Sequence, residues 1–592
     1  MKKLLSFIVL FFSIIVMTSN TLAQESVTDA TTKKEKEAEA QRKKALDLLS
    51  LTTAEMRVLK IPENRILLLS QAAGLWWRYD EKEARTLIQE ISISLKALLN
   101  NADENHPQNR LSWLRRSLRQ QVIQLIARYD LDLALEVLRN TRPALPQGEA
   151  IQQESNAYEV SLEQSLAAQT AANNPAVALK LAEQTLEKGF SYELGRLVEI
   201  VAGKDRPAAA RFLGQCLKKL QTQKILQEQQ SNYFVLNVLR QEFRAQKKEL
   251  SAGERMNGIK LREPILSLAE LKKWIETLCQ AALRSQPTAE SVKDQNSYGL
   301  LTGLQQLLPD IEKYNPEYVS LINKSLSKLL PLLPEHTKDN IELNRYLQKG
   351  DVEGLLLAAE KAPKEKKDNL YDNAVFAAIT VQADFDLARK IITDHITDPY
   401  RKKEKIALVE WVAAQARADE GKIDEAIASL AGLENDTARA DTMASIAESL
   451  LQKGNKKAAA QLLEKAYQFL GGQIESTQGF QALARITKGF AEADPARALE
   501  IYESPIEYLN DVVSALTLIC RYEQNGSRCF SVKDELMIVP NLTFTQGILN
   551  YVESMKSFGG LDFTRAIEIT GRFKNSEIRS YARLRILEAA LN

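Results

Sequence analysis

The chain has 592 residues, with 78 Lys and Arg against 77 Asp and Glu, 45% hydrophobic residues, and few Gly (24) and Pro (17). A formal net charge of +1 gives no basis for nucleic-acid binding, because proteins that follow a phosphate backbone normally carry a clear basic excess. The apolar share excludes disorder over most of the length, and the scarcity of Gly and Pro favours long helices over many short strands. Composition therefore predicts an all-α protein with no nucleic-acid partner.

The first 23 residues are typical of a signal peptide. Met1-Lys2-Lys3 is positively charged, residues 4–17 are apolar apart from two serines, and Thr21-Leu22-Ala23 offers a small-residue cleavage site. The rival interpretation is an uncleaved anchor, but this apolar run is shorter than the about 20 residues that cross a bilayer. We expect cleavage after residue 23 and export, periplasmic or secreted, because the short Lys-Lys start is typical of bacteria. No later apolar run approaches this length, so we expect no transmembrane segment in the mature chain.

A short pattern recurs along the rest of the chain: Asp or Asn, three residues, then Ala. Two degenerate copies keep the spacing, Lys422 to Ala426 and Gly350 to Gly354. From Gly354 to Ala498 the successive anchors are 33 to 39 residues apart. The eight regular copies pair Asp80 with Ala84, Asp130 with Ala134, Asn174 with Ala178, Asp205 with Ala209, Asp384 with Ala388, Asn455 with Ala459, Asp494 with Ala498, and Asp562 with Ala566.

Physical chemistry explains the pattern. Asp and Asn are good N-cap residues for the free amides of a first helical turn, and a small Ala on the apolar face lets a neighbouring helix approach closely. An amphipathic stretch precedes each copy, so each repeat is expected to be a helical hairpin. The gap of 68 residues between Ala498 and Ala566 predicts a degenerate copy near Val532.

The capped helix at this spacing resembles the tetratricopeptide-type and related helical-repeat proteins over most of residues 60–592, as a class and not as a particular protein. The resemblance implies a right-handed α-solenoid of about a dozen helical hairpins. We expect a charged spacer at 24–45, N-terminal repeats at 46–220, an irregular helical segment at 221–345 and regular repeats at 346–592. The final helix, Glu577 to Ala590, is expected to cap the stack with a solvated outer face.

The sequence carries no clear motif of catalysis or cofactor binding. The three histidines, His106, His336 and His395, are far apart in sequence, and the chain has no C-x-x-C, Gly-x-Ser-x-Gly or phosphate-binding glycine motif. We therefore expect no cofactor, no metal and no catalytic residue. Glu290-Ser291 and the later Gly299-Leu300-Leu301 are faintly similar to motifs of the lytic transglycosylases, which are exported superhelical enzymes acting on peptidoglycan. That family supplies the alternative function.

Candidate contact residues are few. Trp76 and Trp77 point about 100° apart on a helix, so either one lines a groove or both are buried between helices. Trp113, Arg115 and Arg119 lie on one expected helix, either facing an acidic partner or forming a solvated face. Residues 524–545 interrupt the helical period and are the expected partner-facing loop.

Cys520 and Cys529 flank a turn-like segment, and either form a disulfide or remain two thiols. Taken together, the sequence predicts an exported, non-catalytic scaffold that binds an unidentified protein or peptide in the cell envelope or outside the cell. A subunit that only supports a larger envelope complex is the third possibility.

Overall fold

The structure is a computed structural model that describes most of residues 36–591. The described part excludes 101–109, 144–148, 223–228, 248–261, 285–295, 523–530 and 539–542, most of 335–350, and isolated positions at 37, 431–432, 434, 472–473, 475 and 533. The predicted signal peptide and the first part of the charged spacer lie outside the described residues. Residues 38–57 form one helix, so the end of the predicted spacer is the start of that helix.

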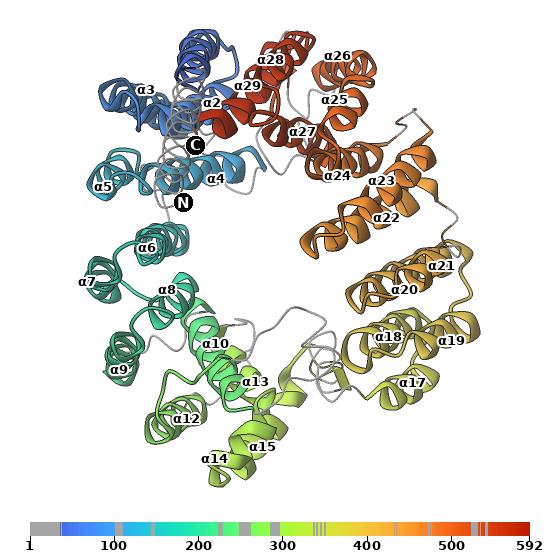
Figure 1. The fold of residues 1–592 in the computed structure, drawn as a ribbon. Helices are drawn as coiled ribbons and strands as arrows, with labels where there is room; N and C mark the ends of the chain where they lie inside the picture. The colour runs from blue at the N-terminus through green and yellow to red at the C-terminus, as the bar shows by residue number, and fades with distance from the viewer. Residues whose placement is uncertain are drawn as a thin grey trace, which may run out of the picture. The chain divides into compact units, whose positions relative to one another are not determined.

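The described residues are all-α, as predicted, and form the helical hairpins of an α-solenoid (Figure 1). Among them, no helix is both long enough and apolar enough to span a lipid bilayer.

The chain divides into two compact units, and the boundaries between them differ from those expected from the sequence. Unit 1 joins residues 1–91 to residues 450–592, whereas unit 2 comprises residues 92–449. The expected boundary at residue 220 falls within unit 2, where buried side chains from Ala167 to Leu333 form one hydrophobic cluster. Residues 221–333 therefore share their core with the repeats before them.

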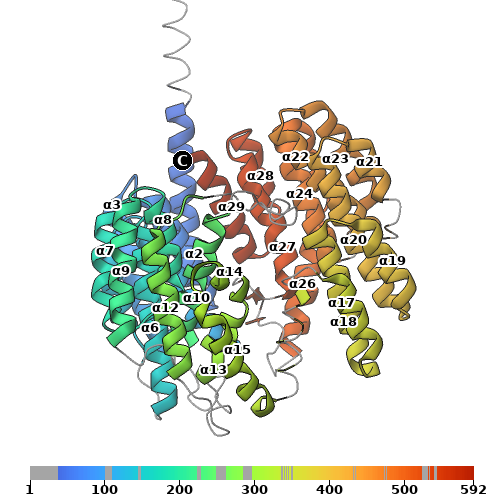
Figure 2. The same cartoon turned by 90° about the horizontal axis from the view of Figure 1, so that it is seen from below.

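Unit 2 is built of hairpins whose successive helices pack on one another (Figure 1; Figure 2). Its elements are α4 (Arg110–Ile126), α5 (Leu131–Asn140), α6 (Glu149–Thr170), α7 (Pro175–Leu186), α8 (Glu193–Ala202), α9 (Arg206–Thr222), α10 (Gln229–Ala245), α12 (Leu268–Arg284), α13 (Asn296–Gln305), α14 (Leu308–Tyr314), α15 (Glu317–Leu329), η3 (Leu330–Leu332), α17 (Val352–Lys361), α18 (Lys364–Ala377), η4 (Ala378–Gln382), α19 (Phe385–His395), α20 (Pro399–Asp419) and α21 (Ile423–Ser429). Two helices cross the division between the units: α3 (Glu81–Asn100) and α22 (Asp436–Gln452).

The predicted caps are confirmed at all eight regular copies of the repeat. In each copy the Asp or Asn side chain accepts a hydrogen bond from the backbone N–H three residues later, at 2.9 to 3.3 Å. The Ala four residues after the cap is fully buried every time. The pattern therefore marks where a capped helix starts and which residue of that helix faces the core.

The degenerate copies behave differently from each other. Lys422 makes no side-chain cap bond, although Ala426 is fully buried. The copy expected at Gly350 to Gly354 was placed one residue too early, because Asp351 is the cap and accepts from the Gly354 N–H at 2.8 Å. Leu355, and not Gly354, is the buried residue four positions on.

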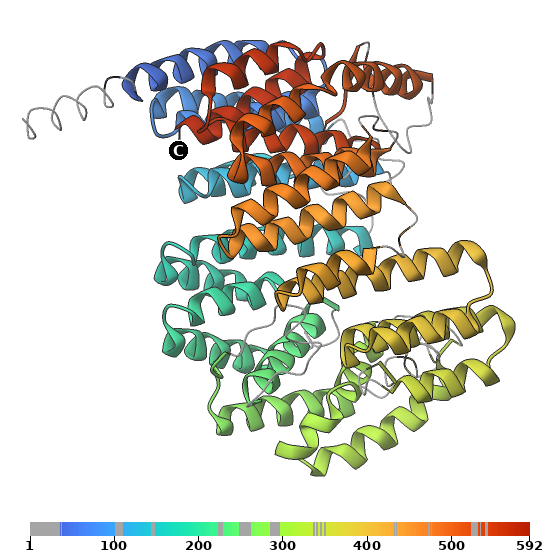
Figure 3. The ribbon, with the colours of Figure 1, turned by 45° about the vertical axis from the view of Figure 1, so that its right-hand side comes forward.

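In unit 1 the N-terminal and C-terminal segments of the chain pack side by side (Figure 3). Helix α29 contacts α2 as well as α27, α28 and η6. Besides the helix at 38–57, the elements of this unit are α2 (Pro62–Trp76), α23 (Lys456–Leu470), α24 (Thr477–Ala493), α25 (Pro495–Glu503), α26 (Ile506–Tyr522), β1 (Ser531–Val532), β2 (Glu535–Leu536), α27 (Thr543–Glu553), η6 (Ser554–Phe558), α28 (Phe563–Gly571) and α29 (Ser576–Leu591).

This packing overturns the expectation of a solvated outer face on the last helix. Glu577 and Ser580 of α29 are fully buried, and Arg585 is 7% exposed. The Arg585 guanidinium donates to Gln71 of α2 at 2.6 Å and pairs with Glu553 at 3.2 Å. The N-terminal helices cover the surface that a free end of the stack would expose to water.

The prediction of a helical copy of the repeat near Val532 was also wrong. The described residues there form an antiparallel strand pair, β1 with β2, and Glu535 to Ile538 are at most 3% exposed. Ile538 donates its N–H to Asn64 of α2 at 2.8 Å. This part of the expected partner-facing loop therefore faces the protein's own N-terminal helix.

Candidate functional site

The two adjacent tryptophans lie at the end of α2 and are both half-buried. Trp76 donates its indole N–H to the Thr53 hydroxyl at 3.3 Å. The Arg85 guanidinium carbon lies 5.0 Å from the centre of the Trp77 ring, a cation–π contact. Neither ring is enclosed, so both stay part of the surface of unit 1.

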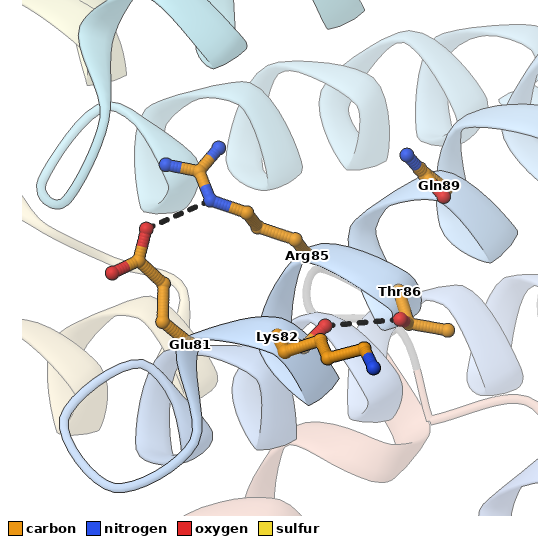
Figure 4. A pocket seen from close by; sticks show the side chains of 5 residues that line it. All are labelled: Glu81, Lys82, Arg85, Thr86 and Gln89. Carbon is orange, nitrogen blue, oxygen red and sulfur yellow. Dashed lines mark hydrogen bonds and ion pairs between the residues drawn. The ribbon is translucent and has the colours of Figure 1, made fainter.

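A polar hollow of about 390 Å³ lies beside this contact, on the first turns of α3 (Figure 4). Arg85 pairs with Glu81 at 2.8 Å, and the Thr86 hydroxyl donates to the Lys82 carbonyl at 2.9 Å. The lining residues all come from one helix: Glu81, Lys82, Arg85, Thr86 and Gln89. The two interactions drawn already use groups that a ligand would need, so we regard this hollow as a weak candidate.

The prediction that Trp113, Arg115 and Arg119 share one surface of α4 is wrong for Arg119. Trp113 is 56% exposed and Arg115 half-buried, as a surface contact requires. Arg119, in contrast, is fully buried and forms a two-point ion pair with Glu159 at 2.6 and 2.9 Å. Trp113 and Arg119 are six residues apart and point to different sides of the helix. Arg119 therefore links α4 to α6 and cannot meet a partner together with Trp113.

Metal and nucleophile chemistry find no support in the described part of the chain. It holds no group of three or more His, Cys, Asp or Glu residues placed to bind a metal ion. His395 stacks on Tyr371 with ring centres 4.5 Å apart, whereas His106, His336, Glu290 and Ser291 lie outside the described residues. Cys216 and Cys279 are buried thiols, and burial raises the pKa of Cys279 to about 12. Cys520 lies buried in the last turn of α26, but Cys529 lies outside the described residues, so the disulfide stays a prediction.

One carboxyl group has an unusual pKa. Burial raises the pKa of Glu577 to about 7, and the nearby carboxylates of Glu535 and Asp534 add to the effect. Such a shift often marks a general acid. Glu577, however, is fully buried and accepts the Leu536 N–H at 3.0 Å, so no substrate reaches it. Glu577 belongs to the contact between the N-terminal and C-terminal segments of the chain within unit 1, which we call the joint.

Sequence reasoning missed an exposed apolar face on α18 and α20. Phe376 is 54% exposed, Leu408 38% and Trp411 41%. Arg401 of α20 pairs with Asp368 and Asp372 of α18, at 2.9 and 2.6 Å. These pairs hold the start of α20 beside α18, the helix that carries Phe376.

A signal for this face was present in the sequence. Tyr400, Leu408 and Trp411 are spaced as residues of one helix face, and all three are exposed. Apolar residues at such spacing normally indicate a core face, so the sequence alone does not distinguish exposed from buried.

A cavity of about 320 Å³ lies between the start of α20 and the link from α21 to α22. Among the residues that the structure describes, the charged ones that line it are Lys402 and Lys403, and the others are mostly apolar: Pro399, Ile406, Ala407, Leu433 and Ala438, with Asn435.

The cavity arises because the hairpin is uneven. Helix α20 has 21 residues and α21 only 7, which correspond to about 31 Å and about 10 Å of helix. The short α21 covers the last turns of α20 and leaves the first turns without an outer helix. Leu433, at 2% exposed, fills only part of the space. This is the hairpin of the degenerate repeat copy, in which Lys422 replaces the capping Asp or Asn.

The described residues thus define a helical-repeat protein of the α-solenoid class. No family model matches the chain, and no curated protein matches it. Among solved structures, the chain is similar to one described as "Circular tandem repeat protein with novel repeat topology and enhanced subunit contact surfaces". The likeness has 13% sequence identity and a TM-score of 0.14, over 92% of this chain and 98% of that chain. A TM-score this low carries no argument, and the class rests on the capped hairpins themselves.

Proposed function

We propose that the protein is an exported, non-catalytic helical-repeat scaffold that binds a protein or peptide in the cell envelope or outside the cell. The observation that carries the binding role is the apolar face formed by Phe376, Leu408 and Trp411. Large apolar side chains that cluster on a surface mark protein contact sites, whereas isolated ones need no explanation. Aromatic residues are also the most frequent anchors of protein interfaces.

Export rests on the residues of the predicted signal peptide alone. Residues 1–30 fused to alkaline phosphatase should give periplasmic phosphatase activity in a bacterial host. Replacing Leu5, Ile8 and Leu10 by Arg should abolish it, because the apolar region is what the export machinery recognises. Activity that is absent from the unchanged fusion would remove the export part of the proposal.

The binding role is tested by site-specific crosslinking in cells that produce the full chain. A photo-reactive phenylalanine analogue replaces Trp411 in one variant and Leu321, an exposed residue of α15, in the control. We expect a discrete crosslinked protein from position 411 and none from position 321. A transient partner gives a substoichiometric adduct, and a permanent envelope complex gives a nearly complete one. Equal crosslinking at both positions, or none at 411, argues against this face.

The enzymatic alternative has its own experiment. A peptidoglycan zymogram of the mature protein should show no cleared band. A cleared band that Glu290→Gln abolishes would replace the scaffold by a lytic transglycosylase.

A further inference from the structure

We infer that the exposed side of α26 pairs with the same side of α26 in a second copy of this chain, with the two helices antiparallel. This inference goes beyond the proposed function and concerns another surface, because Phe376, Leu408 and Trp411 belong to unit 2 whereas α26 belongs to unit 1. The second copy is identified by the apolar spacing along α26, by the order of its side-chain sizes and by the distribution of its charges.

Helix α26 is apolar on two opposite sides. Its inner side is buried in unit 1 and includes Leu509, Val513 and Cys520. On the outer side, Leu518 and Ile519 are both exposed. A helix with apolar side chains all round is normally buried all round. The outer side therefore has the composition of a surface that packs against another helix.

The apolar residues of the outer side follow the spacing of a coiled coil. They are separated by four, three, four and three residues: Tyr508, Val512, Ala515, Ile519 and Tyr522. All five are exposed except Val512, which is half-buried. Side chains at this spacing form a seam along one side of a helix, here over about 21 Å, that packs against a second helix.

The order of side-chain sizes makes this seam complementary to itself. A tyrosine stands at each end, a β-branched residue comes next from either end, and Ala515 stands at the centre. An antiparallel pair centred on Ala515 places Tyr508 of one copy beside Tyr522 of the other, and the small central residue lets the helices approach closely. A two-fold dimer uses the same patch on both copies. A seam made for a different partner has no reason to read alike in both directions.

The charges of α26 favour the antiparallel direction. Its acidic residues, Glu507 and Asp511, lie in the first half, and its basic residue, Arg521, lies in the last turn. Parallel pairing places the acidic halves of two copies side by side, whereas antiparallel pairing separates them and opposes the two helix dipoles. Glu507 also lies 3.9 Å from Arg572, with its side chain 84% exposed.

Disulfide crosslinking of the full-length mature protein tests the pairing at a single residue. Ala515→Cys places a thiol on the two-fold axis, where the facing surfaces of two helices are close enough for a disulfide. We expect a covalent dimer on a non-reducing gel after mild oxidation with copper phenanthroline. Ser514→Cys, an exposed neighbour about 100° around the same helix, is the control. It should give no more dimer than the wild-type protein, whose four cysteines set the background.

A mixture of two single variants tests the direction. Tyr508→Cys and Tyr522→Cys, one of them enlarged by a fused tag, should form a mixed disulfide dimer in higher yield than either forms with itself. Dimers of each variant with itself, without the mixed product, would overturn the antiparallel pairing.

Sedimentation velocity over a range of concentrations measures the association without a crosslink. We expect a monomer–dimer equilibrium. Ile519→Glu should raise its dissociation constant at least about tenfold, because each copy would then bring a carboxylate into the seam. Leu561→Glu changes an exposed apolar residue of unit 1 outside α26 and should leave the constant unchanged.

A second variant separates loss of pairing from loss of folding. If Ile519→Glu lowers the thermal unfolding midpoint, Tyr522→Ala replaces it, because this side chain is 81% exposed in one copy, and it should weaken the dimer in the same direction. A monomer at every concentration, a dimer that the α26 variants leave intact, or equal crosslinking from positions 514 and 515 would each overturn the inference. None of these readouts involves position 411, so the proposed function is tested separately.

Discussion

The regular hairpins and the joint between the chain's two ends are stabilised in different ways. A hairpin cap is local, since a side chain bonds a backbone N–H three residues later, as Asp562 does with Arg565 at 2.9 Å. The joint in unit 1 is long-range. There Glu535 accepts the Lys60 N–H at 2.6 Å and the Asn64 amide at 2.9 Å, across 475 and 471 residues.

The two regions also differ in how far a single substitution should lower the free energy of unfolding. Each cap is an exposed or part-buried hydrogen bond repeated in many hairpins, so the effect of its loss is small and stays within one helix. The joint concentrates buried polar groups in one place, where an unpaired donor or acceptor is expensive. Variants of the joint should therefore be the most damaging, and variants of the caps should be mild.

Glu535→Ala should have the largest effect. It leaves the N–H groups of Lys60 and Ile61 and the Asn64 amide without their carboxylate partner. We expect a loss of about 4 kcal/mol in the free energy of unfolding of unit 1, measured by urea denaturation. Asp534→Ala is the control, because its side chain is 81% exposed and its ion pair with Lys60 lies at the surface. Similar losses for both variants would mean that the buried hydrogen bonds do not stabilise the joint.

Glu577 should make the stability of the same joint depend on pH. Its pKa is about 7 in the folded chain against an ordinary value of 4.5, so the unfolded chain releases this proton first as the pH rises. The free energy of unfolding should therefore fall between about pH 4.5 and pH 7, by about 3 kcal/mol in all. Above pH 7 this group adds no further dependence.

Urea denaturation at a series of pH values measures this change. Glu577→Gln should remove this fall in the free energy of unfolding with pH, and it should be more stable than the wild-type protein at pH 8. The exposed control Glu492→Gln should show the same pH dependence of stability as the wild-type protein. A Glu577→Gln protein with an unchanged pH profile would show that Glu577 is ionised in the folded chain at low pH.

The caps should give a smaller and uniform effect. Asp494→Ala and Asp562→Ala each remove one bond to a first-turn N–H, at 3.3 and 2.9 Å. We expect each to cost about 1 kcal/mol by urea denaturation. Asp511→Ala, an exposed position inside α26, should cost less or even stabilise, because Ala favours a helix interior. Equal effects at all three positions would contradict the capping role.

The caps depend on neighbouring residues, whereas the joint depends on residues far apart in the sequence. This difference explains which features the sequence could predict. The eight caps and their buried Ala residues were located correctly because each depends on a few neighbouring residues. The copy at 350–354 was misplaced because Gly350 and Asp351 are both plausible turn residues, and only the structure shows Asp351 capping Gly354.

The joint could not be predicted in this way. The strand pair was mistaken for a helical copy because its hydrogen-bond partners lie on α2, outside any local pattern. Arg119 was assigned to the surface because an Arg is usually exposed, and its buried partner Glu159 is 40 residues away. The cavity, in contrast, left a local trace, since Lys422 occupies the cap position of the 7-residue helix α21.

A substitution at Lys422, the uncapped start of α21, should have the smallest effect on stability. The backbone at Lys422 has φ −87° and ψ 65°, nearly the values of the capping residue Asn455, φ −87° and ψ 67°. An Asn at position 422 therefore needs no change of backbone to accept from the N–H three residues later. Lys422→Asn should raise the thermal unfolding midpoint of unit 2 by about 2 °C, measured by circular dichroism.

The matched control is Lys453→Asn, an exposed lysine beside the cap of the next hairpin, which should leave the midpoint unchanged. A cap at 422 stabilises the first turn of α21 and does not lengthen that helix, so the cavity beside α20 should persist. A Lys422→Asn protein with an unchanged midpoint, or one no more stable than Lys453→Asn, would show that the missing cap does not weaken α21.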